Sequence, residues 1–187
     1  MINYPENDND PFVSIDCQQN IGSYDPNDKA GFPRGYGDEF FIEANTDIEY
    51  KIRFQNTGTD TAFTVRILDE IDPALDIASI RPGASSHPYE LLIEDGALQF
   101  IFENIMLPDS NINEVASHGF VKFRIAQQPD NPLGTQIYNK AGIYFDFNLP
   151  IITNETLHTI GEDYIATSVS TSSPEAGRAI QVAPNPF

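Results

Sequence analysis

Residues 50–74 read YKIRFQNTGTDTAFTVRILDEIDPA, and this stretch decides the fold. Apolar side chains occupy every second position before and after a polar turn, and the alternation begins just upstream. A period of two is typical of strands with one buried face. The turn residues 56–60 include asparagine, glycine and aspartate, which tolerate positive φ and bond their own backbone. The side chains predicted to share the buried face are Ile48, Tyr50, Ile52, Phe54, Phe63, Val65 and Ile67.

The same alternation recurs along the chain, with turn residues about every 8–12 positions. Asp95-Gly96 separates two such segments and predicts a tight hairpin with a primed turn. No long stretch has a helical period, and residues 69–77 accommodate one helical turn at most. We therefore predict an all-β, Ig-like antiparallel β-sandwich of seven to nine strands, with extended N- and C-terminal tails. The predicted strands are 39–43, 47–55, 62–69, 89–94, 97–103, 119–126, 136–147 and 155–160.

Charge and composition exclude several classes of partner. The 187 residues carry a formal net charge of -18, with 28 acidic against 10 basic side chains. Such a surface repels nucleic acid and anionic membranes, so neither is a predicted partner. No run of about 18 apolar residues is present, which argues against membrane insertion. Cys17 is the single cysteine, so neither an intrachain disulfide nor a cysteine-based zinc site is expected.

Composition divides the chain into four segments. Residues 1–22 are polar and are interpreted as a linker or a strand from a preceding region. Residues 23–161 form the predicted sandwich, which opens with a loop over 23–37 because that stretch is dense in proline and glycine. A Ser/Thr-rich linker over 162–178 and the truncated start of a further domain over 179–187 follow. We therefore expect the chain to be a piece of a longer protein.

Six segments carry a resemblance to a known family: 23–29, 54–63, 81–88, 105–110, 117–123 and 143–148. They are similar to the conserved-repeat, Ig-like domain (DUF11/DUF7619-like) of large secreted Bacteroidetes surface proteins. The likeness covers about residues 23–161. The closing VAPNPF, residues 182–187, resembles the opening of the C-terminal sorting domain of the type IX secretion system. The resemblance implies a secreted or cell-surface location and an accessory module without defined chemistry.

Two oxygen-rich segments predict a calcium site if they meet in the fold. One is the loop at 25–28, and the other follows a strand at 146–148. Carboxylate and amide oxygens are the ligands that calcium prefers. The alternative is that these side chains bond neighbouring main-chain amides as turn and cap residues. The predicted ligands are Asp25, Asn27, Asp28, Asp146 and Asn148.

A third oxygen-rich segment, residues 109–114, imitates the start of an EF-hand loop. It lacks the glycine at position six and the glutamate at position twelve, so it is not an EF-hand. We expect a solvated loop there, with an irregular calcium loop as the alternative.

The lysines suggest a different kind of site, a covalent cross-link between side chains. Some surface Ig-like modules cross-link a buried lysine to an asparagine beside a catalytic carboxylate. Lys51 and Lys122 point outward by alternation and fit this role poorly. Lys29 or Lys140 could pair with Asn139 or Asn148. The alternative is that these lysines point outward and form ordinary surface salt bridges, because lysine side chains are rarely buried.

No pattern typical of an enzyme is found. The three histidines lie in scattered segments without ligand spacing, and no phosphate loop, nucleophile elbow or zinc-protease motif appears. Asp69, Glu70 and Asp72 precede Pro73 and are interpreted as turn residues rather than glycosidase acids. We predict a protein that is not an enzyme.

The sequence thus predicts a non-catalytic structural or spacer module of a large secreted or cell-surface protein, which links or presents other domains and packs into a surface assembly. The alternative is a calcium-dependent adhesive or carbohydrate-binding module that uses exposed aromatic side chains such as Tyr36 and Tyr89. The predicted partners are neighbouring domains of the same chain, with a homo-assembly or a surface ligand as further candidates.

Overall fold

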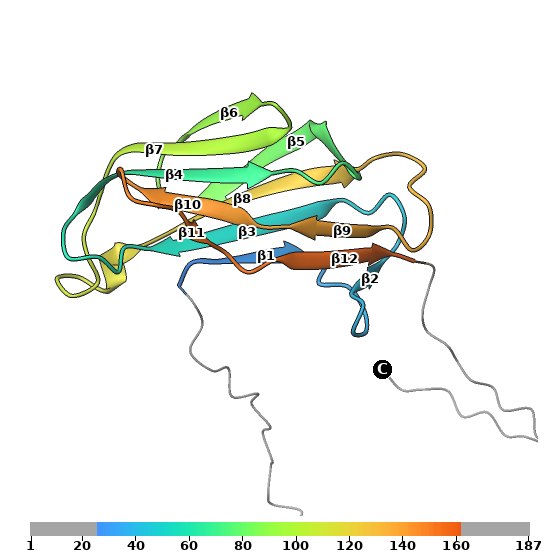
Figure 1. Ribbon diagram of the computed structural model, residues 1–187, viewed down its shortest axis with the longest axis horizontal. Coiled ribbons are helices and arrows are strands. Elements are labelled where there is room, and N and C mark those ends of the chain that lie inside the picture. Colours follow the sequence, from blue (N-terminus) through green and yellow to red (C-terminus); the bar gives the residue numbers. More distant parts are fainter. Residues whose placement is uncertain (1–25, 162–187) are drawn as a thin grey trace, which may run out of the picture.

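The computed structural model describes residues 26–161, which form two facing layers of β-strands (Figure 1). One layer has the strand order β1-β3-β8-β5, and the other has β11-β10-β4-β7-β6. A three-stranded sheet, β2-β12-β9, prolongs the second layer, because only Lys140 separates β9 from β10. The elements are β1 (Asp28–Phe32), β2 (Phe41–Ile42), β3 (Ile48–Gln55), β4 (Ala62–Glu70), β5 (Leu75–Ser85), β6 (Glu90–Glu94), β7 (Ala97–Leu107), η1 (Val115–Ser117), β8 (His118–Gln127), β9 (Gln136–Asn139), β10 (Ala141–Phe145), β11 (Ile151–Ile152) and β12 (Thr156–Ile160).

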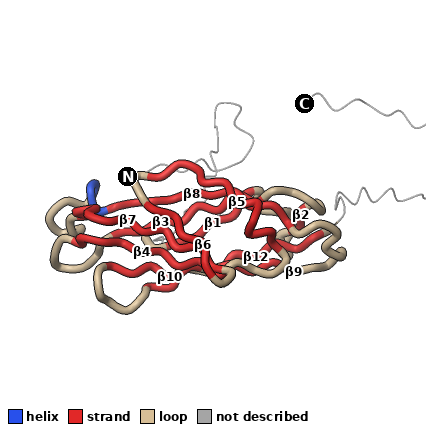
Figure 2. Tube along the Cα trace, turned by 90° about the horizontal axis from the view of Figure 1, so that it is seen from above, coloured by secondary structure: helices blue, strands red, loops and turns tan. Residues whose placement is uncertain are grey.

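The predicted all-β, Ig-like sandwich is confirmed. The strands run along the long axis, and the loops gather at the two ends (Figure 2). Every pairing is antiparallel within residues 26–161, except the short parallel pair of β2 and β12. The same range contains no helix with the length and apolar character to cross a membrane. The predicted tails at 1–22, 162–178 and 179–187 lie outside the described residues.

The core forms where the alternating faces of the two layers meet. Ile48, Tyr50, Ile52 and Phe54 of β3 are all fully buried, as their period of two predicts. Facing them, β7 contributes Phe102, whose ring centroid lies 5.2 Å from that of Phe54. The Asp95-Gly96 hairpin is also confirmed, since both residues have positive φ and Glu94 pairs with Ala97.

The predicted inward position of Phe63 is wrong. Its side chain is 55% exposed, whereas Ala62, Val65 and Ile67 are buried. The register between β4 and β7 shifts between Ala62 and Thr64, and this irregularity turns Phe63 to the outer face. The inward alternation therefore starts again at Val65 and continues through Ile67 to Asp69.

Two further predictions about local structure are wrong. Residues 28–32 lie in the predicted loop 23–37, yet they form β1, which pairs with β3 along its whole length. β1 is an edge strand, and edge strands often carry charged side chains, here Asp28 and Lys29, which obscure the period of two. The strand prediction also omitted β5, which begins at Leu75. Residues 69–77, where we expected one helical turn at most, hold the end of β4, a short turn at Pro73 and the beginning of β5.

Candidate functional site

Three polar side chains from distant strands meet inside the sandwich. Lys29 lies on β1, Asp69 near the end of β4 and Asn139 at the end of β9. Their exposed fractions are 2%, 0% and 2%. Each occupies an inward position of its strand, so the two-layer packing brings them together. The site thus connects the first strand of one layer to two strands of the opposite layer.

The amine of Lys29 contacts both other side chains. Its Nζ donates a hydrogen bond to Oδ2 of Asp69 and another to Oδ1 of Asn139. The side chains of Lys29 and Asp69 are both fully inaccessible to solvent. Burying a lysine is costly, because its charge loses water and must find compensating partners. Here those partners come from positions 40 and 110 residues further along the chain.

Aromatic rings surround the amine and keep water away from it. Nζ of Lys29 lies 4.6 Å from the ring centroid of Tyr50 and 5.4 Å from that of Phe123. These two rings contact each other at 5.4 Å, and Phe100 stacks on Phe123 at 5.6 Å. The rings provide an apolar surrounding in which uncharged forms of amine and carboxyl are favoured.

Burial shifts the titration of both ionisable groups. Loss of solvation lowers the pKa of the Lys29 amine, and the attraction of Asp69 only partly opposes this. Loss of solvation likewise raises the pKa of the Asp69 carboxyl, against the opposing effects of Lys29 and of a hydrogen bond from Asn139. Both shifts favour a neutral amine beside a protonated carboxyl. A neutral amine has a free lone pair, which is the form required of a nucleophile.

Two buried polar atoms of the site have no hydrogen bond of normal geometry among the described residues. They are Oδ1 of Asp69 and Nδ2 of Asn139, although the Asn139 side chain is close enough to Asp69 to lower the pKa of its carboxyl. A buried polar atom without a partner is costly, by about 1–3 kcal/mol, and such atoms gather where structure serves chemistry. The unpaired groups are a proton carrier and the amide nitrogen of a carboxamide, beside an amine. This set of groups can transfer an acyl group from one nitrogen to another.

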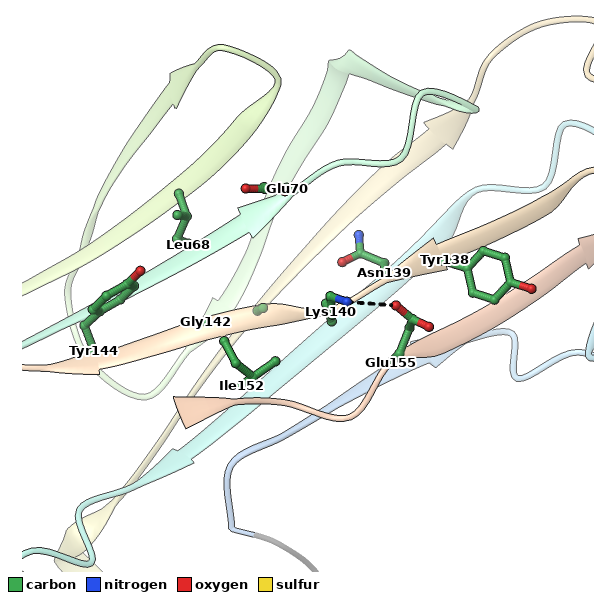
Figure 3. Close-up of a pocket in the computed structure, with 10 residues that line it drawn as sticks. Leu68, Glu70, Tyr138, Asn139, Lys140, Gly142, Tyr144, Ile152 and Glu155 are labelled. Carbon is green, nitrogen blue, oxygen red and sulfur yellow. Dashed lines mark ion pairs between the residues drawn. The ribbon is translucent and has the colours of Figure 1, made fainter. Parts of the chain in front are cut away.

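Asn139 also borders a hollow of about 280 Å³ on the outer side of β4 and β10. Figure 3 shows the hollow, with Leu68, Gly142, Tyr144 and Ile152 around it. At its edge, Lys140 reaches Glu155 at 3.3 Å, and both side chains are exposed. Two consecutive residues, the last of β9 and the one after it, thus carry a buried asparagine and an exposed, salt-bridged lysine.

The positions of the four lysines show which of them can form the cross-link. Lys51 faces the ring of Phe120 at 5.0 Å, and Lys122 pairs with Glu49 at 2.8 Å, so both lie away from the core as predicted. Lys140 is likewise on the surface. Of the four lysines, Lys29 alone is fully buried among residues 26–161, and its asparagine partner is Asn139.

The interpretation of Asp69 as a turn residue is wrong. It lies within β4, opposite Ala141 of β10 and Leu98 of β7, and its side chain points inward. The sequence itself indicates the inward position of Asp69. Val65, Ile67 and Asp69 share one face of the strand, so the alternation places a carboxylate in the core.

The residues predicted to bind calcium make other contacts. Oδ1 of Asn27 accepts from the main-chain nitrogen of Gln55 at 3.2 Å, and Asp28 forms a two-point ion pair with Arg53 on β3. Asp25 lies outside the described residues. Among the residues that are described, no three acidic, histidine or cysteine side chains gather as a metal site.

The second segment predicted to bind calcium, residues 146–148, lies directly after β10. Oδ1 of Asp146 accepts from the main-chain nitrogens of Phe63 and Thr64 at 2.9 and 2.8 Å, and Asn148 is exposed. These are the turn and cap contacts that formed the alternative interpretation. Calcium binding by Asp25, Asn27, Asp28, Asp146 and Asn148 stays a prediction.

The remaining candidates take local roles. Oδ1 of Asp109 accepts from the main-chain nitrogens of Asn111 and Ile112 at 2.9 and 3.2 Å, which is turn chemistry. Tyr36 is exposed, as the adhesive alternative requires. Tyr89 is not, because its ring packs at 5.5 Å from Phe100 as part of the core's edge.

The histidines bond to neighbours along the chain or to main chain. His87 contacts Ser86, His118 contacts Glu114, and His158 contacts the carbonyl of Pro33. None of these contacts joins a histidine to both a nucleophile and an orienting acid, which a catalytic triad needs.

Comparison with known proteins places the fold. Residues 25–159 match the family described as domain of unknown function DUF7619. The N-terminal domain of the Streptococcus gordonii adhesin Sgo0707 is similar with a TM-score of 0.51 and 14% identity, over 73% of this chain and 33% of that one. A variant of BcpA, the major pilin subunit of Bacillus cereus, is similar with a TM-score of 0.50 and 13% identity, over 71% of this chain and 39% of that one. The chain thus spans less than half the length of either protein. No curated protein sequence matches it.

Proposed function

From the premise that the chain belongs to the DUF7619 family, we propose that it supplies a structural module of a cell-surface protein, locked by an amide bond between Lys29 and Asn139. The bond forms within the folded module, without a cofactor, and Asp69 is its catalytic residue. The buried contact of one amine with a carboxyl and a carboxamide is the observation that carries this proposal.

The reaction is an acyl transfer from one nitrogen to another. The neutral amine of Lys29 attacks Cγ of Asn139 and forms a C–N bond, while protonated Asp69 transfers its proton to Oδ1. The resulting Asp69 carboxylate accepts a proton from the Lys29 nitrogen and passes it to Nδ2 of Asn139, and the hydroxyl at Oδ1 returns its proton to Asp69 as the carbonyl forms again. The bond from Cγ to Nδ2 breaks, and ammonia leaves. The carboxyl of Asp69 ends as it began, and the protein loses about 17 Da, the mass of ammonia.

An ordinary buried ion pair is the competing interpretation of the same contacts. It explains the bonds from Lys29 to Asp69 and to Oδ1 of Asn139, but it leaves Nδ2 of Asn139 buried without a hydrogen bond of normal geometry. A buried ion pair often stabilises no more than apolar side chains of the same volume would. The acyl transfer gives a role to the amine, the carboxyl and the carboxamide, including Oδ1 of Asp69 and Nδ2 of Asn139.

The fold supports the cell-surface role. The similar structures are, by name, a domain of an adhesin and a major pilin subunit. A module that links domains must resist unfolding when it is pulled, and a covalent bond between its layers meets this need. The reaction occurs once, on the protein's own side chains, so the proposed module is not an enzyme with turnover. Export through a sorting domain that begins at residues 182–187 belongs to the same proposal.

Intact mass under denaturing conditions tests the proposal. We expect the wild-type protein to weigh about 17 Da less than its sequence, and the K29A, N139A and D69A variants to have their full sequence mass. K140A is the matched control, because Lys140 neighbours Asn139 but bonds to exposed Glu155. It should show the same loss as the wild type. A wild-type mass equal to the sequence mass would contradict the proposal and leave the ion-pair interpretation.

A further inference from the structure

Asn154 holds the main chain of Lys29 at two points. It lies between β11 and β12 in the opposite layer. The main-chain nitrogen of Lys29 donates to Oδ1 of Asn154 at 2.9 Å, and Nδ2 of Asn154 donates to the carbonyl of Lys29 at 2.9 Å. One carboxamide thus satisfies both main-chain groups of one residue.

This contact replaces a missing neighbour strand. β1 pairs with β3 on one side, where Lys29 lies opposite Ile52. In an antiparallel ladder, the two main-chain groups of a residue point to the same side. Those of Lys29 point away from β3, to the edge of the sheet, where Asn154 receives them. The edge of β1 is therefore fixed at the residue that carries the amine.

The same short segment also fixes the other reacting residue. Oγ1 of Thr156 donates to the carbonyl of Asn139 at 3.1 Å. Thr153 exchanges bonds with Ala141, since its nitrogen donates to the carbonyl at 2.9 Å and its Oγ1 accepts from the nitrogen at 3.0 Å. Residues 153–156 thus contact the main chain of Lys29 on one side and the strand of Asn139 on the other.

We infer that Asn154 is a positioning residue for the acyl transfer between Lys29 and Asn139, an inference that rests on the proposed function. A lysine side chain has four rotatable carbon–carbon bonds, so its amine is placed only if its Cα is fixed. Asn154 fixes that Cα relative to β9, from the segment that also holds Asn139. Reactions between held groups gain rate from such placement, and small displacements cost much of it.

The segment's position in the chain gives the contact a second effect. β11 and β12 are the last strands of the described module. Lys29 therefore receives its two main-chain bonds only after residues 153–156 have docked. Bond formation is coupled to completion of the fold, and this slows cross-linking in a partly folded chain.

The rate of bond formation after synthesis tests the inference. The full chain is made in a short cell-free pulse, and the fraction that has lost about 17 Da is followed in time for wild type, N154A and N154D. The rate is taken per folded molecule, with protease resistance as the measure of folding. We expect N154A to react about 10- to 100-fold more slowly than wild type. N154D keeps the acceptor for the Lys29 nitrogen and loses the donor, so its rate should fall between the two.

Q127A is the matched structural control. The side chain of Gln127 also bonds main-chain groups, those of Asn45, Glu43 and Thr46, but none of these residues belongs to the site. It should lower stability and leave the rate per folded molecule unchanged.

The outcomes separate the two proposals. A wild-type chain that loses ammonia while N154A reacts at the same rate per folded molecule overturns the positioning role and leaves the cross-link standing. Equal slowing in Q127A and N154A also overturns it, because the effect would then follow stability alone. A wild-type chain that never loses ammonia overturns both.

Discussion

At the scale of single residues, Lys29 and Asp69 each make the other's burial tolerable. Neither side chain contacts solvent, and their attraction offsets part of the cost of removing them from water. The pair has no net charge whether the proton lies on the amine or on the carboxyl. Burial favours the uncharged forms, so the reactive state costs little to reach.

His158 gives the module a pH dependence of its own. The side chain is buried, and its ring meets that of Tyr50 edge-on at 6.0 Å. Burial lowers its pKa from 6.5, with the carbonyl of Pro33 opposing the shift. The unfolded chain therefore binds a proton more readily than the folded one does. The neutral ring contributes to the free energy of unfolding above pH 6.5, and this contribution is lost as the pH falls below 6.5.

Urea unfolding between pH 5 and 8 measures this dependence. We expect the midpoint to fall on the acid side in wild type and to change less in H158Q. H118Q is the control, because His118 lies at the surface beside Glu114. A wild-type slope that survives in H158Q would show that other groups titrate.

Asp146 is expected to act as a cap rather than through calcium. Its Oδ1 accepts two main-chain hydrogen bonds and supports a turn in which its own φ is 50°. D146A should lower the free energy of unfolding by about 1–3 kcal/mol. The loss should be equal in millimolar calcium and in excess EDTA. A calcium-dependent rise in the wild-type unfolding midpoint that D146A abolishes would instead establish the calcium site.

At the scale of elements, β3 and β1 differ in how far sequence predicts them. The alternation of β3 is complete in itself, so its buried face follows from its own residues. β1 reads Asp-Lys-Ala-Gly-Phe and has no such pattern. Its inward lysine is explained by Asp69 and Asn139, which lie 40 and 110 residues away. Contacts between residues so far apart are set by the tertiary fold. The sequence therefore indicated which side chains were candidates, but not that these three lie in contact.

Pairing of β3 with β8 depends on a glycine. Gly119 lies opposite Phe54, and a Cβ at 119 would come within 2.1 Å of the Phe54 ring. G119A should therefore lower the free energy of unfolding by about 1–3 kcal/mol, because the ring must leave its place in the core. G142A is the matched strand control, since a Cβ there meets its nearest neighbours at an ordinary 3.5 Å. Denaturant unfolding measures both, and equal stabilities for the two variants would contradict this packing.

At the scale of the whole molecule, the cross-link closes a loop from residue 29 to residue 139. Tension applied at residues 26 and 161 passes from Lys29 through the new bond to Asn139, so β3 to β8 carry no load. Only residues 26–28 and 140–161 can extend. Single-molecule pulling should therefore release about one fifth of the length that K29A releases, at about 3.6 Å per residue. Full extension of the wild type would show that the loop is open.

The central claim is a covalent bond between Lys29 and Asn139, and peptide mapping tests it most directly. Trypsin cleaves after lysine and arginine, so an unmodified chain yields residues 1–29, 30–34 and 125–140 as separate peptides. Modified Lys29 resists cleavage. We predict one branched peptide in which residues 1–34 are joined to residues 125–140, with fragment ions that place the branch at Lys29 and Asn139. Separate linear peptides from the denatured wild-type protein would contradict the account.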